Sequence, residues 1–200
     1  MKTILVPTDF SQSADNAARY AVNLAREMKA KLLLFHVYDI PMVVAGDLAA
    51  PLITPNELKK ESANLLKKTA ANLQKISPVE IKCKVTTGAA IDEILAEEKK
   101  ASFIVMGMKG AGKLNELIIG SITTGVLKRT KKPLLIIPAK AKFKHPKKIV
   151  LATDYDPTTN AKSFNALKKI KKAFNSKVFV VNVRNTKEGI GKENAVAEMK

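Results

Sequence analysis

The stretch MGMKGAGKLNELIIGS, residues 106–121, decides how this chain can fold and what it can hold. It continues the apolar run Phe103–Met106, which has the composition of a buried strand. Three of the glycines that follow are separated by two and then by nine residues: Gly107, Gly110 and Gly120. Ser121 then opens a segment with helical character. A strand, a glycine-rich loop and a helix N-terminus can together cradle phosphate groups, because glycines let the backbone approach a ligand and the first helical N–H groups attract anions.

The glycine spacing differs from two common phosphate-binding motifs. It is neither GxxxxGK[ST] nor GxGxxG followed about 20 residues later by an acid. Three glycines are also what structural turns require, and on the residues alone turns are the simpler interpretation. The residues by themselves therefore leave two alternatives open, a phosphate site and a set of turns.

Strand-like and helix-like segments alternate along the first two thirds of the chain. Apolar runs and alternating patterns predict strands over residues 2–7, 31–37, 79–86, 103–106 and 134–137. Apolar residues at helical spacing predict helices over residues 14–28, 57–76, 90–100 and 122–130. Five strands alternating with four helices predict an α/β fold with a doubly wound parallel sheet. Ligands of such sheets bind beyond the carboxyl ends of the strands, where the winding reverses.

Two distant motifs resemble one known family. The glycine spacing matches G-x2-G-x9-G-[ST], the nucleotide-binding signature of the universal stress protein family, and ILVPTDFS, residues 4–11, resembles that family's first strand and acidic turn. The resemblance covers residues 1–139. It implies a five-stranded parallel sheet in the order 3-2-1-4-5, the adenine nucleotide alpha hydrolase-like fold. It also implies a site for ATP, with or without Mg2+, in the crevice between strands 1 and 4.

The resemblance implies which residues would hold the nucleotide. Asp9 would accept hydrogen bonds from the base or the ribose; its alternative role is a helix N-cap. Val37 would line the adenine pocket, or else belong to the core, and Met106 would pack on the sugar or base. The whole implied set is Pro7, Thr8, Asp9, Val37, Met106, Gly107, Gly110, Gly120, Ser121, Ile122 and Thr123.

The phosphates would lie on the glycine loop and the helix that follows it. The backbone N–H groups of Gly107 and Gly110 would approach them. The terminal phosphates would be held by the start of the helix: Gly120, Ser121 and the amide of Ile122, with Thr123 as a further hydroxyl donor.

The sequence pattern of the N-terminus recurs after residue 146. Residues 147–155 (KKIVLATDY) repeat the pattern of residues 2–10 (KTILVPTDF), and a predicted helix over 161–174 and a strand over 177–183 follow. This pattern is an internal repeat and resembles a tandem member of the same family. It predicts three parts: a complete domain over 1–139, a linker over 140–146 and an incomplete second copy, β-α-β, over 147–200.

The second copy lacks a glycine loop, so it is not expected to bind nucleotide. A unit of this length buries little of its own apolar face. We therefore expect that the chain is truncated; the alternative is that the second copy docks on the first domain or on another chain.

The chain is strongly basic. Its net charge is +17, and residues 140–200 hold fifteen Lys or Arg against five Asp or Glu. Such a bias can attract nucleic acid, but nearly all the basic residues are Lys and aromatic residues make up only 5%. Proteins that recognise nucleic-acid bases use bidentate Arg side chains or exposed aromatic rings. A solvated lysine-rich surface is therefore the favoured interpretation, and nucleic acid is not an expected partner.

The sequence also predicts a compartment. It contains no apolar run long enough to span a membrane and does not start with a signal-peptide pattern. The single Cys83 lies in an alternating run and is expected to be an inward-facing core thiol. Together these features predict a cytoplasmic protein without a membrane partner.

Few residues could catalyse a reaction. His36 and His145 have no partner that the sequence identifies, and G-x-S-x-G is absent. The sequence thus predicts slow ATP hydrolysis at most, with no catalytic residue and no protein-held metal. The resulting hypothesis is a stress-response protein in which ATP acts as a switch or sensor. The alternatives are a scaffold of the same fold that binds no nucleotide, and a slow ATPase. The resemblance also implies a homodimer, or pairing through the strand Leu134–Ile137.

Overall fold

The computed structural model describes residues 2–39, 54–108, 119–153, 164–182 and 196–199, the last range by its backbone only. The chain forms two compact units, Met1–Phe143 and Lys144–Lys200. The boundary between them falls inside the predicted linker. No helix in the described part of the chain is both long and apolar enough to cross a membrane.

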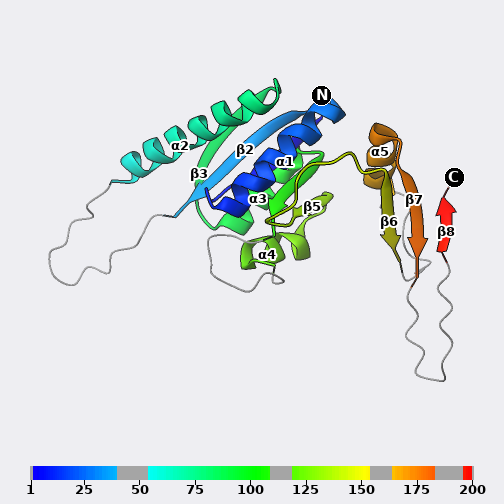
Figure 1. Ribbon diagram of the computed structural model, residues 1–200. Coiled ribbons are helices and arrows are strands. Elements are labelled where there is room, and N and C mark those ends of the chain that lie inside the picture. The colour runs from blue at the N-terminus through cyan, green and yellow to red at the C-terminus, as the bar shows by residue number, and fades with distance from the viewer. Residues whose placement is uncertain (1, 40–53, 109–118, 154–163, 183–195, 200) are drawn as a thin grey trace. The chain divides into compact units, whose positions relative to one another are not determined.

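Unit 1 contains a five-stranded sheet in the order β3-β2-β1-β4-β5 (Figure 1). All four neighbouring pairs are parallel. The fold class and strand order expected from the sequence are therefore confirmed. The strands are β1 (Thr3–Pro7), β2 (Lys31–Tyr38), β3 (Ile81–Thr87), β4 (Phe103–Gly107) and β5 (Leu134–Ile137).

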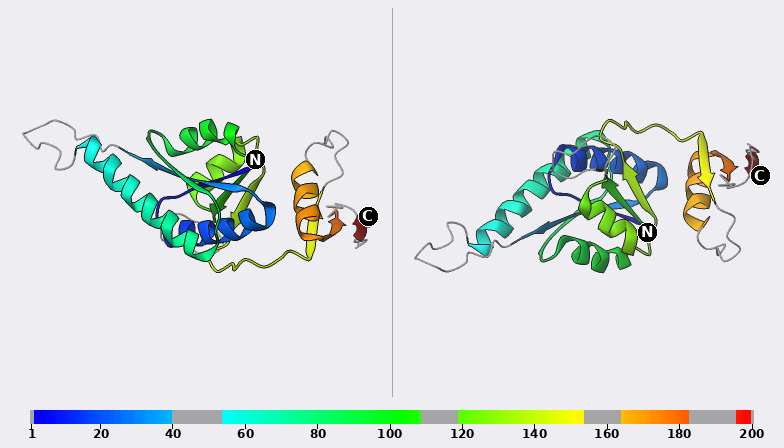
Figure 2. Two further views of the ribbon diagram at one scale, coloured as in Figure 1. Left: turned by 90° about the horizontal axis from the view of Figure 1, so that it is seen from above. Right: turned by 90° about the horizontal axis from the view of Figure 1, so that it is seen from below.

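Helices cover both faces of this sheet, as right-handed crossovers in a doubly wound fold require (Figure 2). Two of them, α1 and α2, pack together on one face, while α3 and α4 pack together on the other. The helices are α1 (Gln12–Met28), α2 (Pro55–Ile76), α3 (Ala90–Glu97), which a short 3-10 turn η1 (Glu98–Lys100) extends, and α4 (Ser121–Arg129).

The ends of these helices follow from local sequence. Ser11 is the N-cap of α1 and its hydroxyl accepts a hydrogen bond from the amide of Ala14. Thr54 and Glu57 form a reciprocal capping box at the start of α2. Lys29 is the C-cap of helix α1 and adopts the left-handed conformation with φ 49°.

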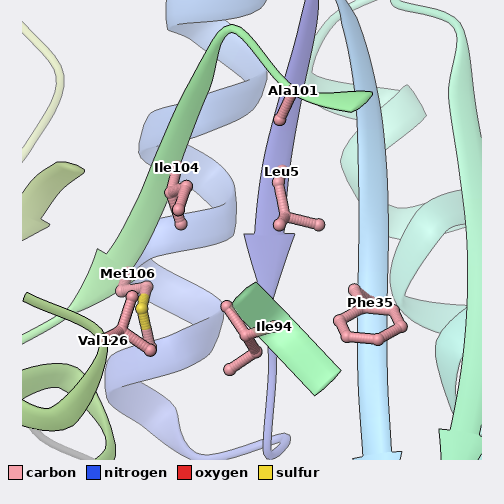
Figure 3. Packing of buried hydrophobic residues seen from close by; sticks show 7 residues of the cluster. All are labelled: Leu5, Phe35, Ile94, Ala101, Ile104, Met106 and Val126. Carbon is pink, nitrogen blue, oxygen red and sulfur yellow. The ribbon is translucent and has the colours of Figure 1, made fainter. Parts of the chain in front are cut away.

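The core beneath α3 and α4 fixes the centre of the sheet. Leu5 of β1 is completely buried there against residues from β2, β4, α3 and α4. Figure 3 shows the labelled members of this cluster: Leu5, Phe35, Ile94, Ala101, Ile104, Met106 and Val126. Because β1 has a strand on each side and helices on both faces, its side chains lose contact with water.

Cys83 departs from the expectation of a core thiol. It is exposed, because β3 lies at the edge of the sheet and has no strand beyond it. Its sulfur lies 3.7 Å from the carbonyl oxygen of Leu66 on α2. Partial burial by that helix raises the pKa of the Cys83 thiol, although the charge of Lys67 acts in the opposite direction.

Unit 2 contains a three-stranded sheet in the order β6-β7-β8. Strands β6 and β7 are parallel, and β8 is antiparallel to β7. One helix, α5, connects β6 to β7. The elements are β6 (Lys148–Ala152), α5 (Asn165–Phe174), β7 (Lys177–Val181) and β8 (Val196–Met199). The last of these strands is not among the elements that the sequence patterns predict.

Candidate functional site

The carboxyl end of β1 forms a tight turn into α1. Thr8 is buried, and its amide donates to the Phe35 carbonyl at 2.9 Å, which prolongs the β1–β2 ladder by one residue. The Thr8 hydroxyl accepts from the amide of Phe10, and Asp9 Oδ1 accepts from the amide of Ser11, both at 3.0 Å. The Asp9 carboxylate therefore orders the turn but is not the helix N-cap, a role that Ser11 fills. Asp9 remains exposed to solvent at the sheet edge.

Phe10 adopts an unusual conformation within this turn. Its φ is 61°, in the left-handed region, which costs a bulky L-residue about 1–2 kcal/mol. Its ring packs on His36 of β2, with ring centroids 4.4 Å apart. His36 Nδ1 in turn donates to the Thr8 carbonyl at 2.7 Å. The turn that carries Asp9 is thus held from both sides, by β2 and by its own side chains.

His36 has a partner that the sequence did not identify. The one sequence feature that indicates such a partner is the position of His36, a polar residue near the carboxyl end of an apolar strand. The register, with Pro7 opposite Phe35, decides that the next residue of β2 faces the turn after β1. A β-register between distant segments cannot be derived from either segment alone.

The end of β4 is tied to the start of α4 by two hydrogen bonds. The Thr123 hydroxyl donates to the Gly107 carbonyl at 2.9 Å, and the Gly120 amide donates to the Met108 carbonyl at 2.7 Å. Thr123 is buried and its hydroxyl proton is already used. Its role in this arrangement is to position the helix start relative to β4.

Gly107 is required by packing within the protein. A Cβ atom at this position would lie 2.8 Å from the carbonyl oxygen of Ser13 on α1, which is closer than real Cβ atoms approach backbone. The absence of a side chain thus lets α1 cross directly over the end of β4. This is a reason for glycine that does not depend on any ligand.

The first turn of α4 projects beyond the sheet. Gly120 occupies the N-cap position and supplies no side chain to bond the helix amides. The amides of Ser121, Ile122 and Thr123 have no partner within the helix. Ser121 and Ile122 are exposed, and the turn contains no acidic residue that would neutralise the positive end of the helix dipole. This helix end can therefore accept an anion.

The remaining expected residues lie deeper or outside the described part. Val37 is half-buried and packs against the core cluster, and Met106 is a buried member of it. Pro7 is buried at the end of β1. Gly110 lies outside the described residues. The structure thus brings the ends of β1, β2 and β4 and the start of α4 to one edge of the sheet, with Asp9 and Ser121 exposed there.

The buried acids of unit 1 serve packing elsewhere. Glu97 accepts hydrogen bonds from Lys84 and Lys100, and Glu98 accepts from the hydroxyl of Thr130. Burial acts to raise the pKa of Glu97, but the two lysines outweigh it and hold that pKa below its ordinary value. In the described part of the chain, no three His, Cys, Asp or Glu residues gather as a metal site would need.

Comparison with known proteins places this architecture in a family. The model of the universal stress protein family matches residues 1–138. Universal stress protein MJ0531 of Methanocaldococcus jannaschii is 32% identical over 138 residues, which are 68% of this chain and 81% of that protein. A universal stress protein solved in complex with cAMP is 26% identical with a TM-score of 0.52, covering 68% of this chain and 96% of that chain.

A further structure resembles more of the chain. A universal stress protein from Archaeoglobus fulgidus has a TM-score of 0.72 and covers 92% of this chain and 68% of that chain. At 18% identity, this likeness concerns the fold alone. The family match and the identity to MJ0531 carry the assignment, and both rest on the sheet and helices of unit 1. This chain therefore belongs to the universal stress protein family.

Proposed function

We propose that unit 1 binds an adenine nucleotide, ATP, at the edge of the sheet where β1 and β4 end, and that occupancy of this site acts as a switch in a stress response. The observation that carries the proposal is the start of α4. Its first turn offers amides that have no partner within the helix and the Ser121 hydroxyl, contains no acid, and is fastened to β4 through Gly107 and Met108. A relative solved with cAMP supports the adenine part of the proposal.

Within this proposal the two exposed groups have separate tasks. The α4 terminus takes the phosphates through its amides, and Asp9 on the β1 side accepts hydrogen bonds from the ribose or the base. Mg2+ would arrive on the phosphates, because no cluster of protein ligands for it exists among the described residues. Val37 and Met106 would supply apolar contact from the core side.

Calorimetric titration with ATP tests the proposal, with Ser121→Asp as the decisive variant. An acid in the first turn repels phosphate, yet it stabilises the helix by about 0.3–1 kcal/mol, so lost binding cannot be ascribed to unfolding. We expect ATP binding by the natural chain, weaker binding in Ser121→Ala, which removes the hydroxyl but keeps the helix amides, and loss of binding in Ser121→Asp. A purified protein that contains no nucleotide and ignores ATP would contradict the proposal and favour a scaffold.

We also propose that two chains pair through β5. This strand lies at the edge of the sheet, bonded on one side to β4 only, and Leu134, Leu135 and Ile136 are half-buried. An edge strand with apolar side chains is a ready template for pairing. Light scattering over a range of concentrations should show a dimer, and a monomer at every concentration would contradict this part.

A further inference from the structure

The segment that follows β5 lies along helix α1 of unit 1 (Figure 2). We call residues 138–143 the strap. It begins with a turn, which the Ala141 amide closes by donating to the Pro138 carbonyl at 3.0 Å. The side-chain amide of Asn16, on α1, donates to the carbonyls of both residues, at 3.0 Å to Pro138 and 3.1 Å to Ala141. The far end of the strap packs on the same helix, because Phe143 meets Tyr20 edge to face with ring centroids 5.1 Å apart.

The strap is connected to the start of α4 by consecutive backbone hydrogen bonds. The Gly120 amide donates to the Met108 carbonyl at 2.7 Å, and the Met108 amide donates to the Ile137 carbonyl at 2.9 Å. Ile137 directly precedes Pro138, which Asn16 holds. A change in the position of Gly120 therefore reaches the strap through two hydrogen bonds and one peptide bond.

Helix α1 lies against both the strap and the end of β4. Asn16 holds the strap, and three residues earlier the Ser13 carbonyl approaches Gly107 so closely that a Cβ atom there would be 2.8 Å away. The Gly107 carbonyl in turn accepts the hydrogen bond from the Thr123 hydroxyl of α4 at 2.9 Å. Close-packed groups transmit strain, so the helix that carries the strap also senses the start of α4.

The strap buries little surface. Each of its six residues is half-buried or exposed, and Lys140 and Lys142 are among the exposed ones. A segment with few buried apolar contacts opens locally at a small cost in free energy. A ligand that favours the docked form then shifts the balance between a docked and an open strap.

We propose that the strap is the output of the nucleotide switch, and that Asn16 is the positioning residue that couples it to the site. The inference rests on the proposed function, since it takes ATP as the ligand at the start of α4. The phosphates fix the first turn of α4, and Gly120 and Met108 carry that restraint to Ile137 and the strap. Coupling between two sites is reciprocal, so the docked strap raises the affinity for ATP by the factor by which ATP favours docking. Unit 2 begins at Lys144, so an open strap lengthens the connection between the units by up to six residues.

Limited proteolysis with trypsin measures the open population, because Lys140 and Lys142 lie within the strap. Calorimetric titration of the same full-length chain with ATP comes first and tests the proposed function by itself. We expect saturating ATP to slow cleavage at these two lysines about fivefold or more, as located by mass spectrometry. Cleavage after Lys75, exposed in the last turn of α2, is the internal reference for a general gain in stability.

Asn16→Asp is the decisive variant, because it replaces two N–H donors by an acceptor at nearly the same size and helix propensity. Cleavage of the strap should become faster without ATP, and the affinity for ATP should fall by about the protection factor of the natural chain. Phe143→Ala loosens the far end of the strap without adding charge, so a weaker affinity there is not repulsion of phosphate. Asn23→Asp is the matched control, since the Asn23 side chain donates to the Arg19 carbonyl within α1 at 2.9 Å. It should change neither cleavage nor affinity.

The results distinguish failure of this inference from failure of the proposed function. A natural chain that does not bind ATP in the titration contradicts both. ATP binding without slower cleavage at Lys140 and Lys142 overturns only the coupling, and so does an unchanged affinity for ATP in Asn16→Asp and Phe143→Ala. If Asn16→Asp does not fold, the natural chain and Phe143→Ala decide the question.

Discussion

The two β-α-β parts of this chain share their backbone geometry but differ in what surrounds them. In unit 1, β1 lies between β2 and β4, and its Leu5 is sealed beneath α3 and α4. In unit 2, β6 is an edge strand and its Val150 faces solvent. Local sequence is therefore sufficient to form the strands, the helix and the hydrogen bonds of the threonine that follows the first strand, Thr8 or Thr153. It is not sufficient to build the proposed site, because the start of α4 lies in a part of unit 1 that has no counterpart among the described elements of unit 2.

The largest expected effect tests this difference in burial directly. Leu5→Ala should lower the free energy of unfolding of unit 1 by about 2–5 kcal/mol, since it leaves a cavity in a sealed core. The matched change Val150→Ala removes an exposed side chain and should cost less than about 1 kcal/mol. Hydrogen exchange of peptides from each unit reports the two costs separately. Equal costs at both positions would mean that Val150 is covered in solution.

The close approach of α1 to β4 is a second feature of unit 1 without a counterpart among the described elements of unit 2. Gly107→Ala places a methyl group against the Ser13 carbonyl and should cost about 1–3 kcal/mol in urea unfolding. Gly125→Ala is the control, because its methyl would meet only the end of the Ile91 side chain, and alanine favours a helix. We expect the control to be nearly neutral. If both variants behave alike, backbone packing is not the reason for glycine at position 107.

How much of this can be predicted from the sequence depends on whether a feature is local. The strands and helices of unit 1 follow from short patterns, and the sheet order follows from the family resemblance. The prediction for Cys83 is wrong because alternation in β3 does not reveal that this strand lies at an edge. The partner of His36 and the packing reason for Gly107 cannot be read from the sequence, because both depend on residues of other elements, Thr8 and Ser13.

Low pH should destabilise unit 1 through Glu97 of helix α3. This helix has no counterpart among the described elements of unit 2. The pKa of Glu97 lies below its ordinary value of 4.5 when folded. Its contribution to stability is therefore complete above the unfolded value and is lost as pH falls through the lower folded value. Glu97→Gln should cost about 1–2 kcal/mol at neutral pH and flatten the loss of stability below pH 4.5. Glu61→Gln, on the exposed side of α2, is the control and should change the free energy of unfolding by less than about 0.5 kcal/mol.

The smallest expected effect comes from exchanging a residue between the two units. Asn182 makes the same hydrogen bond to Thr153 that His36 makes to Thr8, so His36→Asn should keep the Thr8 carbonyl paired. It loses only the contact with Phe10, worth about 0.5–1 kcal/mol. His36→Leu keeps an apolar contact but leaves that buried carbonyl without its side-chain donor, at a cost of about 1–3 kcal/mol. Thermal unfolding of both variants decides whether the carbonyl or the ring matters more. If His36→Leu is more stable than His36→Asn, the hydrogen bond that the two units share does not hold the turn.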